Sequence, residues 1–276
     1  MALIGRLKEI LGNESMRYQI IKDELKEIKD KFGDERKTEI TYLADEISMQ
    51  DLIEEEDVVV TISHLGYIKR TSATEYRQQR RGGRGAKGSS TRNEDYIEHL
   101  FVASTHHTLL FFTEKGKCFW LKVYEITAGG KQSKGRALQN LMQIPADDKV
   151  RAIIDIKDLQ DEEYINNNYI VLCTRKGIIK KTRVADFSRP RQNGVNAITV
   201  NEGDHLLEAC LTDGKQEIMM ALKSGRAIRF PEEKVRPTGR GAIGVFGISV
   251  EKESDEVVGM ICVNSDDPNV SVLVVS

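Results

Sequence analysis

The chain has 276 residues, of which 39% are hydrophobic and 30% charged, and its formal net charge at pH 7 is −2. A chain of this length can form one large domain or two around a substantial core. No apolar run reaches the roughly 18 residues of a membrane span, and the first residues lack the apolar segment and cleavage site of a signal peptide. The sequence therefore predicts a cytoplasmic protein and excludes a membrane protein.

Residues 1–37 are predicted to form a helical coiled-coil segment. A cap-prone break at 12–15 separates two helical patterns. The second pattern is a narrow apolar seam with alternating spacings of three and four, formed by Tyr18, Ile21, Leu25, Ile28 and Phe32. It ends at Gly33, which suits a helix C-cap. Because so short a seam is not stable alone, it implies a partner helix from elsewhere.

Residues 38–276 are predicted to form a second domain, in which a unit of short β-strands recurs four times. Each unit has an apolar strand, a turn glycine and a strand with basic residues. The turn glycines are Gly66, Gly116, Gly177 and Gly225. A fifth apolar run at 270–275 begins another unit, in which the chain stops. A period near 50 with about four strands is typical of a propeller-like array of blades. A solenoid is the alternative, and the strand count favours blades.

A second glycine follows three of these turn glycines at one constant spacing, at Gly85, Gly135 and Gly244. The third unit has Asn196 at this place, with Gly194 nearby. This spacing adds a second regular loop to the repeating unit.

Charge is segregated along the chain. The four stretches 66–92, 115–136, 175–191 and 223–240 hold 27 Lys and Arg residues against five acids, so the rest of the chain carries a net charge of −24. Segregated charge creates a local field that the net charge conceals. A single basic stretch would suit a solvated turn, but four stretches at similar intervals indicate a surface for a polyanion.

The segment Gln79–Gly85 contains three arginines and three glycines within seven residues. Glycine lets a backbone bend through positive φ and approach a ligand closely, and arginine presents a planar cationic fork suited to phosphate. The segment is therefore predicted to hold a polyanion. It contains no nucleophile, base or metal ligand, so it is not predicted to be catalytic.

No constellation in the sequence suggests an enzyme site within this chain. The four cysteines lie far apart in apolar or β-prone surroundings and are predicted to be buried reduced thiols, not zinc ligands; they are Cys118, Cys173, Cys210 and Cys262. No loop of the form GxxxxGK[ST] occurs, so no nucleotide phosphate site is expected. We predict no catalytic residue, metal site or cofactor in this part of the protein.

Three motifs resemble a known family, the A subunits of bacterial DNA gyrase, which are type IIA topoisomerases. Gln79–Gly85 matches the signature box of that family, and 32–40 resembles the junction between its coiled coil and its C-terminal domain. The Gly-x-Ile-Lys-Arg pattern that starts at Gly66, together with Gly239–Val245, resembles its repeated blade elements. The resemblance covers essentially all 276 residues.

This resemblance implies a mainly β fold: a β-pinwheel, six-bladed in the family, that follows the end of a helical coiled coil. Four units and the start of a fifth are recognised here, so four to five blades are expected. The implied parent protein is an ATP-hydrolysing type II topoisomerase that introduces negative supercoils. The family's catalytic tyrosine lies upstream in another domain. Among the tyrosines of this chain, Tyr76 has the most similar context because an arginine flanks it, but it is not predicted to be a nucleophile. ATP and Mg belong to other domains of the holoenzyme.

The implied partners are double-stranded DNA, the B subunit of gyrase and a second A subunit in an A2B2 heterotetramer, in the bacterial cytoplasm at the nucleoid. The implied role is to bend duplex DNA around a basic rim through contacts with its backbone. The candidate contacts are Lys69, Arg70, Gln79, Arg80, Arg81, Gly82, Gly83, Arg84, Gly85, Lys87, Lys122, Lys134, Arg136, Lys180, Lys181, Arg183, Arg226, Arg229 and Arg240. Two alternatives remain open: the related C-terminal domain of the topoisomerase IV A subunit, which serves decatenation, and a propeller that acts as a protein-interaction platform.

Overall fold

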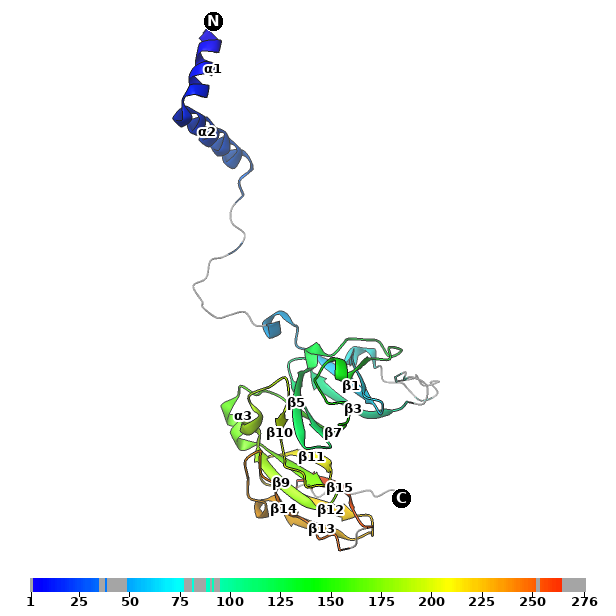
Figure 1. Cartoon of the computed structure of the whole chain (residues 1–276). Helices are drawn as coiled ribbons and strands as arrows, with labels where there is room; N and C mark the ends of the chain where they lie inside the picture. Colours follow the sequence, from blue (N-terminus) through cyan, green and yellow to red (C-terminus); the bar gives the residue numbers. More distant parts are fainter. Residues whose placement is uncertain are drawn as a thin grey trace. The chain divides into compact units, whose positions relative to one another are not determined.

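The computed structural model describes residues 2–34, 38, 49–76, 81, 88–89, 91, 95–251 and 254–264. The chain divides into two compact units, Met1–Ile47 and Ser48–Ser276, and each is described by itself (Figure 1). Within the described residues, no helix has the length and apolar character needed to cross a membrane.

The first unit contains two helices, α1 (Ala2–Gly12) and α2 (Glu14–Phe32). Asn13 lies between them and caps α2, because its side chain accepts a hydrogen bond of 3.0 Å from the backbone N–H of Ser15. At the far end, the N–H of Gly33 donates to the carbonyl of Lys29 at 2.7 Å. The predicted break between two helices and the predicted end of the second are confirmed.

The apolar seam of α2 is exposed to solvent. Phe32 is 74% exposed, and each of the other four seam side chains is at least half exposed. Neither helix has a buried residue. A helix of this length gains most of its stability from packing of an apolar face. The described residues of this unit supply no such packing, so the seam stays free for a partner helix.

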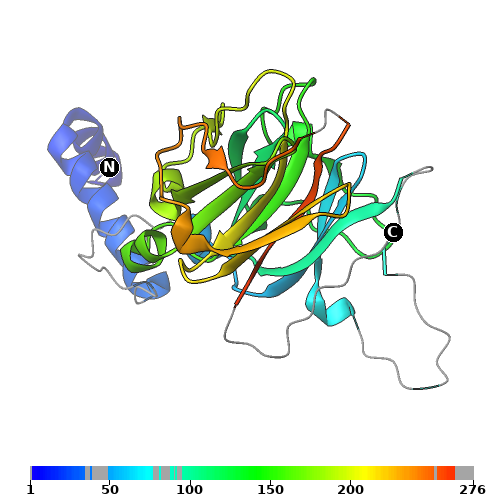
Figure 2. The same ribbon diagram turned by 90° about the horizontal axis from the view of Figure 1, so that it is seen from below.

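The described residues of the second unit form four antiparallel sheets, which follow one another in chain order (Figures 1 and 2). Each sheet takes three strands from one segment of the chain, and these three strands are called a blade. Blade 1 has β1 (Asp57–Ser63), β2 (Tyr67–Ser72) and β3 (Ile97–Ser104); blade 2 has β4 (Thr108–Thr113), β5 (Lys117–Lys122) and β7 (Val150–Ile156); blade 3 has β8 (Tyr169–Thr174), β9 (Ile178–Arg183) and β11 (Leu206–Thr212); blade 4 has β12 (Glu217–Leu222), β13 (Ala227–Pro231) and β15 (Val257–Val263).

Short helices lie before the first of these strands and in the connections between them. They are η1 (Met49–Leu52), η2 (Ala73–Glu75), η3 (Val123–Glu125), η4 (Leu138–Asn140), α3 (Glu162–Asn167), η5 (Val184–Phe187) and η6 (Glu232–Lys234). Four of them, η2, η3, η5 and η6, directly follow the second strand of blades 1, 2, 3 and 4. These turns recur at the same place in each blade, and the last three take part in the joints between blades described below.

A fourth strand reaches each of the first three sheets from the blade that follows. The strand β6 (Arg136–Ala137) comes after blade 2's β5 in the chain but pairs with β2 of blade 1. In the same way, β10 (Val195–Asn196) pairs with β5, and β14 (Val245–Phe246) pairs with β9. Neighbouring blades are therefore joined by strand exchange. In blade 4, the described residues supply three strands, in the order β13-β12-β15.

Three loops, 127–137, 188–196 and 236–246, carry these strands across and are called the exchange loops. Each loop reaches its strand through a glycine of positive φ; that of Gly135 is 74°. A Cβ added at Gly135 would lie 2.6 Å from the carbonyl oxygen of Ile68 in blade 1. Only glycine fits there, because the exchanged strand begins in direct contact with the backbone of the sheet that receives it. This contact explains the regular second glycine of the sequence repeat.

The apolar core lies between the blades. Along β4, Leu109 and Phe111 belong to the cluster shared with blade 1, whereas Leu110 and Phe112 belong to the cluster shared with blade 3. Successive side chains of a strand point to opposite faces, so a blade covered on both faces needs an uninterrupted apolar run. Each phenylalanine is fully buried, which contributes about 1.5–3 kcal/mol. A third cluster joins blades 3 and 4.

The prediction of a mainly β, propeller-like array of blades is confirmed, with four sheets in the described part of the chain. The fifth unit, predicted to begin at residue 270, lies outside the described residues.

Candidate nucleic-acid interface

The lysines that follow two of the turn glycines are buried, in contrast to their prediction as DNA contacts. Lys69 is 3% exposed, and its ammonium group donates to the carbonyls of Gly130, Lys131 and Ser133, at 3.2, 2.9 and 2.8 Å. All three acceptors belong to the exchange loop that blade 2 sends to blade 1. Lys69 therefore holds this loop from beneath and is not available to a ligand on the surface.

Lys180 occupies the equivalent place in blade 3 and is 1% exposed. Its ammonium group donates to the carbonyls of Ala197 and Arg240, both at 2.6 Å. Arg240 belongs to the exchange loop of blade 4. A buried ammonium group must have acceptors, and the exchange loops and their surroundings provide them. We remove Lys69 and Lys180 from the candidate contacts.

The next residue of each strand also faces the following blade. Arg70 donates through Nε to the carbonyl of Ile126 at 2.8 Å, and Trp120 donates through Nε1 to the carbonyl of Phe187 at 2.9 Å. Lys181 lies 2.6 Å from a carboxylate oxygen of Glu232, and both side chains are at most 5% exposed. The residues of the basic motif therefore join neighbouring blades. In blade 2 the aromatic Trp120 takes the place of the basic residue. Lys181 is removed from the candidate contacts, and Arg70 already has a partner.

Three more candidates have partners in the structure. Lys122 donates to the side chain of Gln50 at 3.2 Å and to the carbonyl of His106 at 3.4 Å. Arg226 forms an ion pair with Glu251, and Arg229 forms one with Glu217. Paired charges contribute less to a surface potential than free ones. We therefore place these three residues outside the proposed interface.

A group of unpaired cations lies on the exchange loops and the strand end beside them. Seven side chains there make no hydrogen bond or ion pair with any described residue: Lys134, Arg136, Arg183, Arg189, Arg191, Arg236 and Arg240. Unpaired lysines also lie elsewhere in this unit, for example Lys157 and Lys215. Four of them were predicted from the sequence. Arg189, Arg191 and Arg236 were not predicted, although they lie in the basic stretches, because they stand outside the repeated strand motif.

The predicted box falls almost wholly outside the described residues. Gln79, Arg80, Gly82, Gly83, Arg84, Gly85 and Lys87 are not described, and Arg81 is an exposed residue at a turn. Residues on either side of this segment are described, however. The hydroxyl of Tyr76 donates to the carbonyl of Gly88 at 3.0 Å, and the ammonium group of Lys131 lies 4.5 Å from the centre of the Tyr76 ring. Tyr76 thus links the described residues on the two sides of the segment, beside the first exchange loop.

A recurring aspartate before the third strand of each blade also escaped the sequence reasoning. Asp148 accepts hydrogen bonds from the backbone N–H groups of Lys115 and Lys149, at 3.2 and 3.0 Å. Equivalent bonds are accepted by Asp95, Asp204 and Asp255. Each of these carboxylates links a blade's hairpin turn to its third strand. The available signal was an aspartate at a similar distance after every turn glycine.

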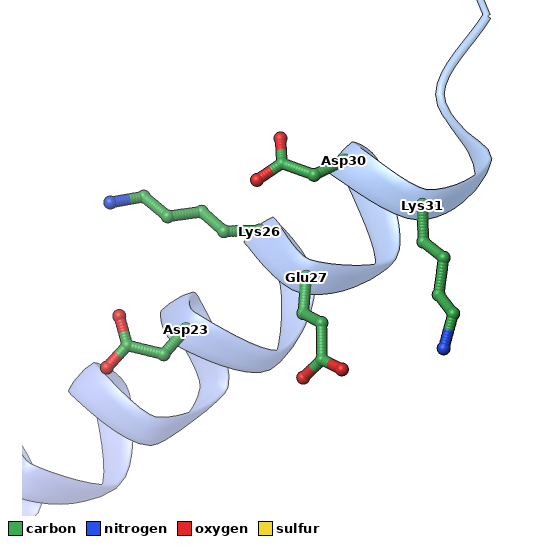
Figure 3. A pocket seen from close by; sticks show the side chains of 5 residues that line it. All are labelled: Asp23, Lys26, Glu27, Asp30 and Lys31. Atoms are coloured by element: carbon green, nitrogen blue, oxygen red, sulfur yellow. The ribbon is translucent and has the colours of Figure 1, made fainter.

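Two further features of the described residues show no convergent chemistry. No three His, Cys, Asp or Glu side chains gather there as metal ligands would. A shallow hollow along α2 is lined by Asp23, Lys26, Glu27, Asp30 and Lys31. Figure 3 shows these charged side chains pointing outward from the helix and not toward a common centre. This surface is a solvated helix face.

The cysteines are thiols, and two of them are buried as predicted. Cys118 and Cys173 are fully buried, and burial raises the pKa of both thiols. Cys210 and Cys262 are only partly buried, on the third strands of blades 3 and 4.

The stability of the domain should rise with pH above about 8 because of Lys180. Burial lowers the pKa of Lys180 to about 8; Asp186 raises it and Arg240 lowers it further. An unfolded lysine has a pKa near 10.4. Between these values the unfolded chain binds more protons, so stability increases with pH. The increase is up to about 3 kcal/mol at 1.36 kcal/mol per pKa unit. Urea unfolding of the wild type and of Lys180→Met at pH 7.5 and 10 measures it; an equal pH dependence in both proteins would contradict it.

The fold and the interface define a class of protein: an array of β-blades joined by strand exchange, with unpaired cations on its exchange loops. Residues 57–104, 107–157, 168–209 and 216–264 match the family model described as DNA gyrase C-terminal domain, beta-propeller. Each matched segment corresponds to one blade, and the third ends within β11. The chain belongs to this family.

Relatives and solved structures agree with this assignment. The DNA gyrase A subunit of Clostridium acetobutylicum is 45% identical over 247 residues, 90% of this chain and 29% of that protein. Its counterpart in Staphylococcus aureus is 42% identical over 258 residues, 93% of this chain and 28% of that protein. The chain therefore spans about three tenths of the length of these curated relatives.

Two solved structures share the fold. The C-terminal domain of DNA topoisomerase IV superposes with a TM-score of 0.63 at 29% identity, over 78% of this chain and 64% of that one. The C-terminal domain of DNA gyrase A superposes with a TM-score of 0.59 at 28% identity, over 75% and 65%.

Proposed function

We propose that this domain binds and wraps duplex DNA, as part of a DNA gyrase that introduces negative supercoils in an ATP-dependent manner. The observation that carries the proposal is the group of seven unpaired cations on the exchange loops and the strand end beside them. The cations of the strand motif, in contrast, are used internally. Successive exchange loops therefore offer successive cationic contacts along the array.

Hydrogen bonds join the exchange loop of blade 4 to the chain that follows the loop of blade 3. Thr199 donates through its backbone N–H to the carbonyl of Ala242 at 3.2 Å and through its hydroxyl to that of Gly241 at 2.9 Å. These hydrogen bonds hold the two loops side by side, so a duplex bound to one loop also lies next to the other. DNA carries one charge per about 1.7 Å of axis, so closely spaced loops can hold a continuous stretch of its backbone and bend it.

The described part of the interface contains no element suited to reading base sequence. Its cations lie on loops and a strand end, and arginine contacts of this kind position a duplex through its phosphates. Bending a site of 20–30 base pairs by 40–90° costs on the order of 1–6 kcal/mol. Several blades must contribute contacts to offset this cost, which agrees with the repetition of the loops.

Within the complete enzyme, the proposed partners are the gyrase B subunit, together with a second A subunit in an A2B2 heterotetramer at the bacterial nucleoid. ATP and Mg would act in other domains. The segment Gln79–Gly85 ends at the sequence position that corresponds to Gly135, the glycine that begins an exchanged strand. We propose that this segment adds the first cationic loop of the rim and fixes the path of the duplex there.

Topoisomerase IV is the second candidate for the parent enzyme, because its C-terminal domain superposes on this chain with a TM-score of 0.63. The proposal of gyrase rests on the two gyrase A relatives and on the segment Gln79–Gly85. A reconstituted holoenzyme separates the two, because gyrase supercoils relaxed circular DNA with ATP whereas topoisomerase IV decatenates without negative supercoiling.

The proposed function predicts duplex binding that weakens steeply with salt and does not depend on sequence. With seven unpaired cations as phosphate contacts, the slope of log affinity against log salt is about −6, because each contact contributes about 0.9. Affinity should therefore fall on the order of 10³–10⁴-fold between 50 and 200 mM salt. Anisotropy titrations with two unrelated duplexes measure this. Wrapping should in addition shift the linking number of relaxed circles closed in the presence of the domain. A shallow slope, or no linking-number shift, would contradict the proposal.

A further inference from the structure

Two partly buried cysteines face the joint between blades 3 and 4 from opposite sides. Cys210 lies on β11 and Cys262 on β15, and these outermost strands of the two described sheets lie side by side (Figure 1). Cys210 pairs with Val171 in blade 3, and Cys262 pairs with Ile218 in blade 4. Both of these partners belong to the apolar cluster that joins the two blades. Because directly opposite residues of antiparallel strands share one face, both thiols point into the joint.

The two thiols influence each other's ionisation. A hydrogen bond with the thiol of Cys262 lowers the pKa of Cys210, whereas burial and the carboxylate of Glu208 raise it. The same hydrogen bond, together with burial, raises the pKa of Cys262. Cys210 is therefore the first of the two to ionise, while Cys262 keeps its proton. Since the thiolate and not the thiol is the nucleophile, Cys210 is the reactive member of the pair.

A third cysteine of the same cluster provides an internal comparison. Cys173 lies on β8 and belongs to the cluster between blades 3 and 4, but it is fully buried. Burial raises the pKa of its thiol, so it remains protonated and shielded from reagents in solution. The described residues contain no group of three His, Cys, Asp or Glu that could hold a metal ion. The chemistry available at the joint is therefore that of a thiol pair.

We propose that Cys210 and Cys262 form an oxidation site, at which a hydroperoxide converts the two thiols into a disulfide between blades 3 and 4. Strands β11 and β15 bring Cα atoms within 8 Å of one another. A small shift of these outermost strands therefore meets the spacing below about 7 Å that a disulfide requires. The bond adds a covalent tie to a joint that is otherwise held by β14 and by the pair Lys181–Glu232. In a reducing compartment such a disulfide is transient, as in redox sensing.

The reaction proceeds in two steps, with hydrogen peroxide as the simplest oxidant of this class. The thiolate of Cys210 attacks one peroxide oxygen, the O–O bond breaks, and the released hydroxide takes up a proton as water, which leaves Cys210 as a sulfenic acid. The sulfur of Cys262 then loses its proton and attacks the sulfenic sulfur. The S–S bond forms, the S–O bond breaks, and the hydroxyl group leaves with a proton as a second water. The two sulfurs together lose two electrons, and one peroxide is reduced to two waters.

Peptide mapping of the full chain under non-reducing conditions tests the pairing. The folded protein is treated briefly with hydrogen peroxide, and the remaining thiols are alkylated after unfolding. We expect one dominant disulfide, between Cys210 and Cys262, which dithiothreitol reverses, whereas Cys118 and Cys173 are recovered as alkylated thiols. The same treatment in urea should give a mixture of pairings, because the fold no longer selects one. The same mixture in the folded protein, a dominant bond through Cys173, a bond between two chains, or no disulfide at all overturns the proposal.

Single variants test the order of the two steps. In Cys262→Ser the second step is blocked, so dimedone should trap a sulfenic acid at Cys210. In Cys210→Ser most of this trapping should be lost, because Cys262 keeps its proton. Cys173→Ala is the matched control and should form the disulfide as the wild type does. Equal trapping in the two serine variants, or loss of the disulfide in Cys173→Ala, would contradict the assigned roles. Circular dichroism checks that the variants are folded, and the mapping of the wild type decides the pairing without them. No DNA is present, so the result does not depend on the proposed function.

Discussion

Replacement of Lys181 by methionine should destabilise the domain by about 3–5 kcal/mol, the usual cost of removing one partner from a buried ion pair. Glu232 is fully buried and keeps two hydrogen bonds in this variant, from Thr212 at 3.0 Å and from Gln216 at 3.1 Å. It loses the only opposite charge that the described residues place within ion-pair distance. The ammonium group also lies 4.3 Å from the centre of the Tyr169 ring, a further contact that is lost. Urea unfolding measures the change.

Two variants give this measurement its control. Lys181→Met/Glu232→Gln removes both charges. It should recover much of the lost stability, because the glutamine oxygen can accept from the Gln216 N–H while its NH2 group donates to the hydroxyl oxygen of Thr212. Arg229→Met breaks an exposed pair with Glu217 and should cost less than about 1 kcal/mol. If Lys181→Met costs no more than Arg229→Met, the pair does not hold blades 3 and 4 together.

Replacement of Gly177 by alanine should lower the free energy of unfolding by more than its position in a hairpin turn suggests. Gly177 has a φ of 85°, which costs an alanine about 1–2 kcal/mol. In addition, the new Cβ would overlap the carbonyl oxygen of Ile248. The carbonyl of Gly177 accepts hydrogen bonds from Gly247 at 2.9 Å and Ile248 at 3.3 Å, directly after the exchanged strand β14. The substitution therefore displaces the exchanged segment from the hairpin of blade 3. It should cost more than about 4 kcal/mol of stability, which is exceptional for a single substitution.

Gly225 provides the matched control because its φ is also 85°. A Cβ added there meets no described atom within 4 Å, so Gly225→Ala should cost only the roughly 1–2 kcal/mol of the left-handed backbone. Hydrogen exchange should show that Gly177→Ala selectively exposes the amides of Val245 and Phe246, which pair with β9. Equal stability losses in the two variants, or unchanged exchange at β14, would show that the clash does not reach the exchanged strand.

The repeat and the fold class were predictable because each blade repeats the same local physics. The turn glycines at 66, 116, 177 and 225 all have positive φ, as hairpins of this kind require. The apolar runs, such as 109–112, mark strands covered on both faces. Strand exchange was not predictable, because a two-residue strand such as β6 carries too little pattern to show which sheet it joins.

The interface was only partly predictable, because the sequence shows charge but not burial. Lys69, Lys180 and Lys181 look like surface cations in a β-strand, and lysine is almost never fully buried without a partner. Their partners are backbone carbonyls of the next blade and one carboxylate, and these come close only in the folded array. Arg191 and Arg240 illustrate the converse, since these two side chains are far apart in the sequence but border one hollow.

Strand exchange has a consequence for how such arrays change length in evolution. Each of the first three sheets combines a receiving edge with a strand encoded in the following blade. Recombination can remove or duplicate one full period of the repeat. Each receiving sheet edge is then still followed by a blade that supplies a strand, wherever within the period the crossover falls. The joint at Glu232 is the exception. Glu232 begins η6, whereas η3 and η5 begin with the buried residues Val123 and Val184. A recombinant that places Lys181 against a valine would keep its sheets, but Lys181 would lose its counterion. Blades 3 and 4 can therefore not be separated by recombination without a loss of stability.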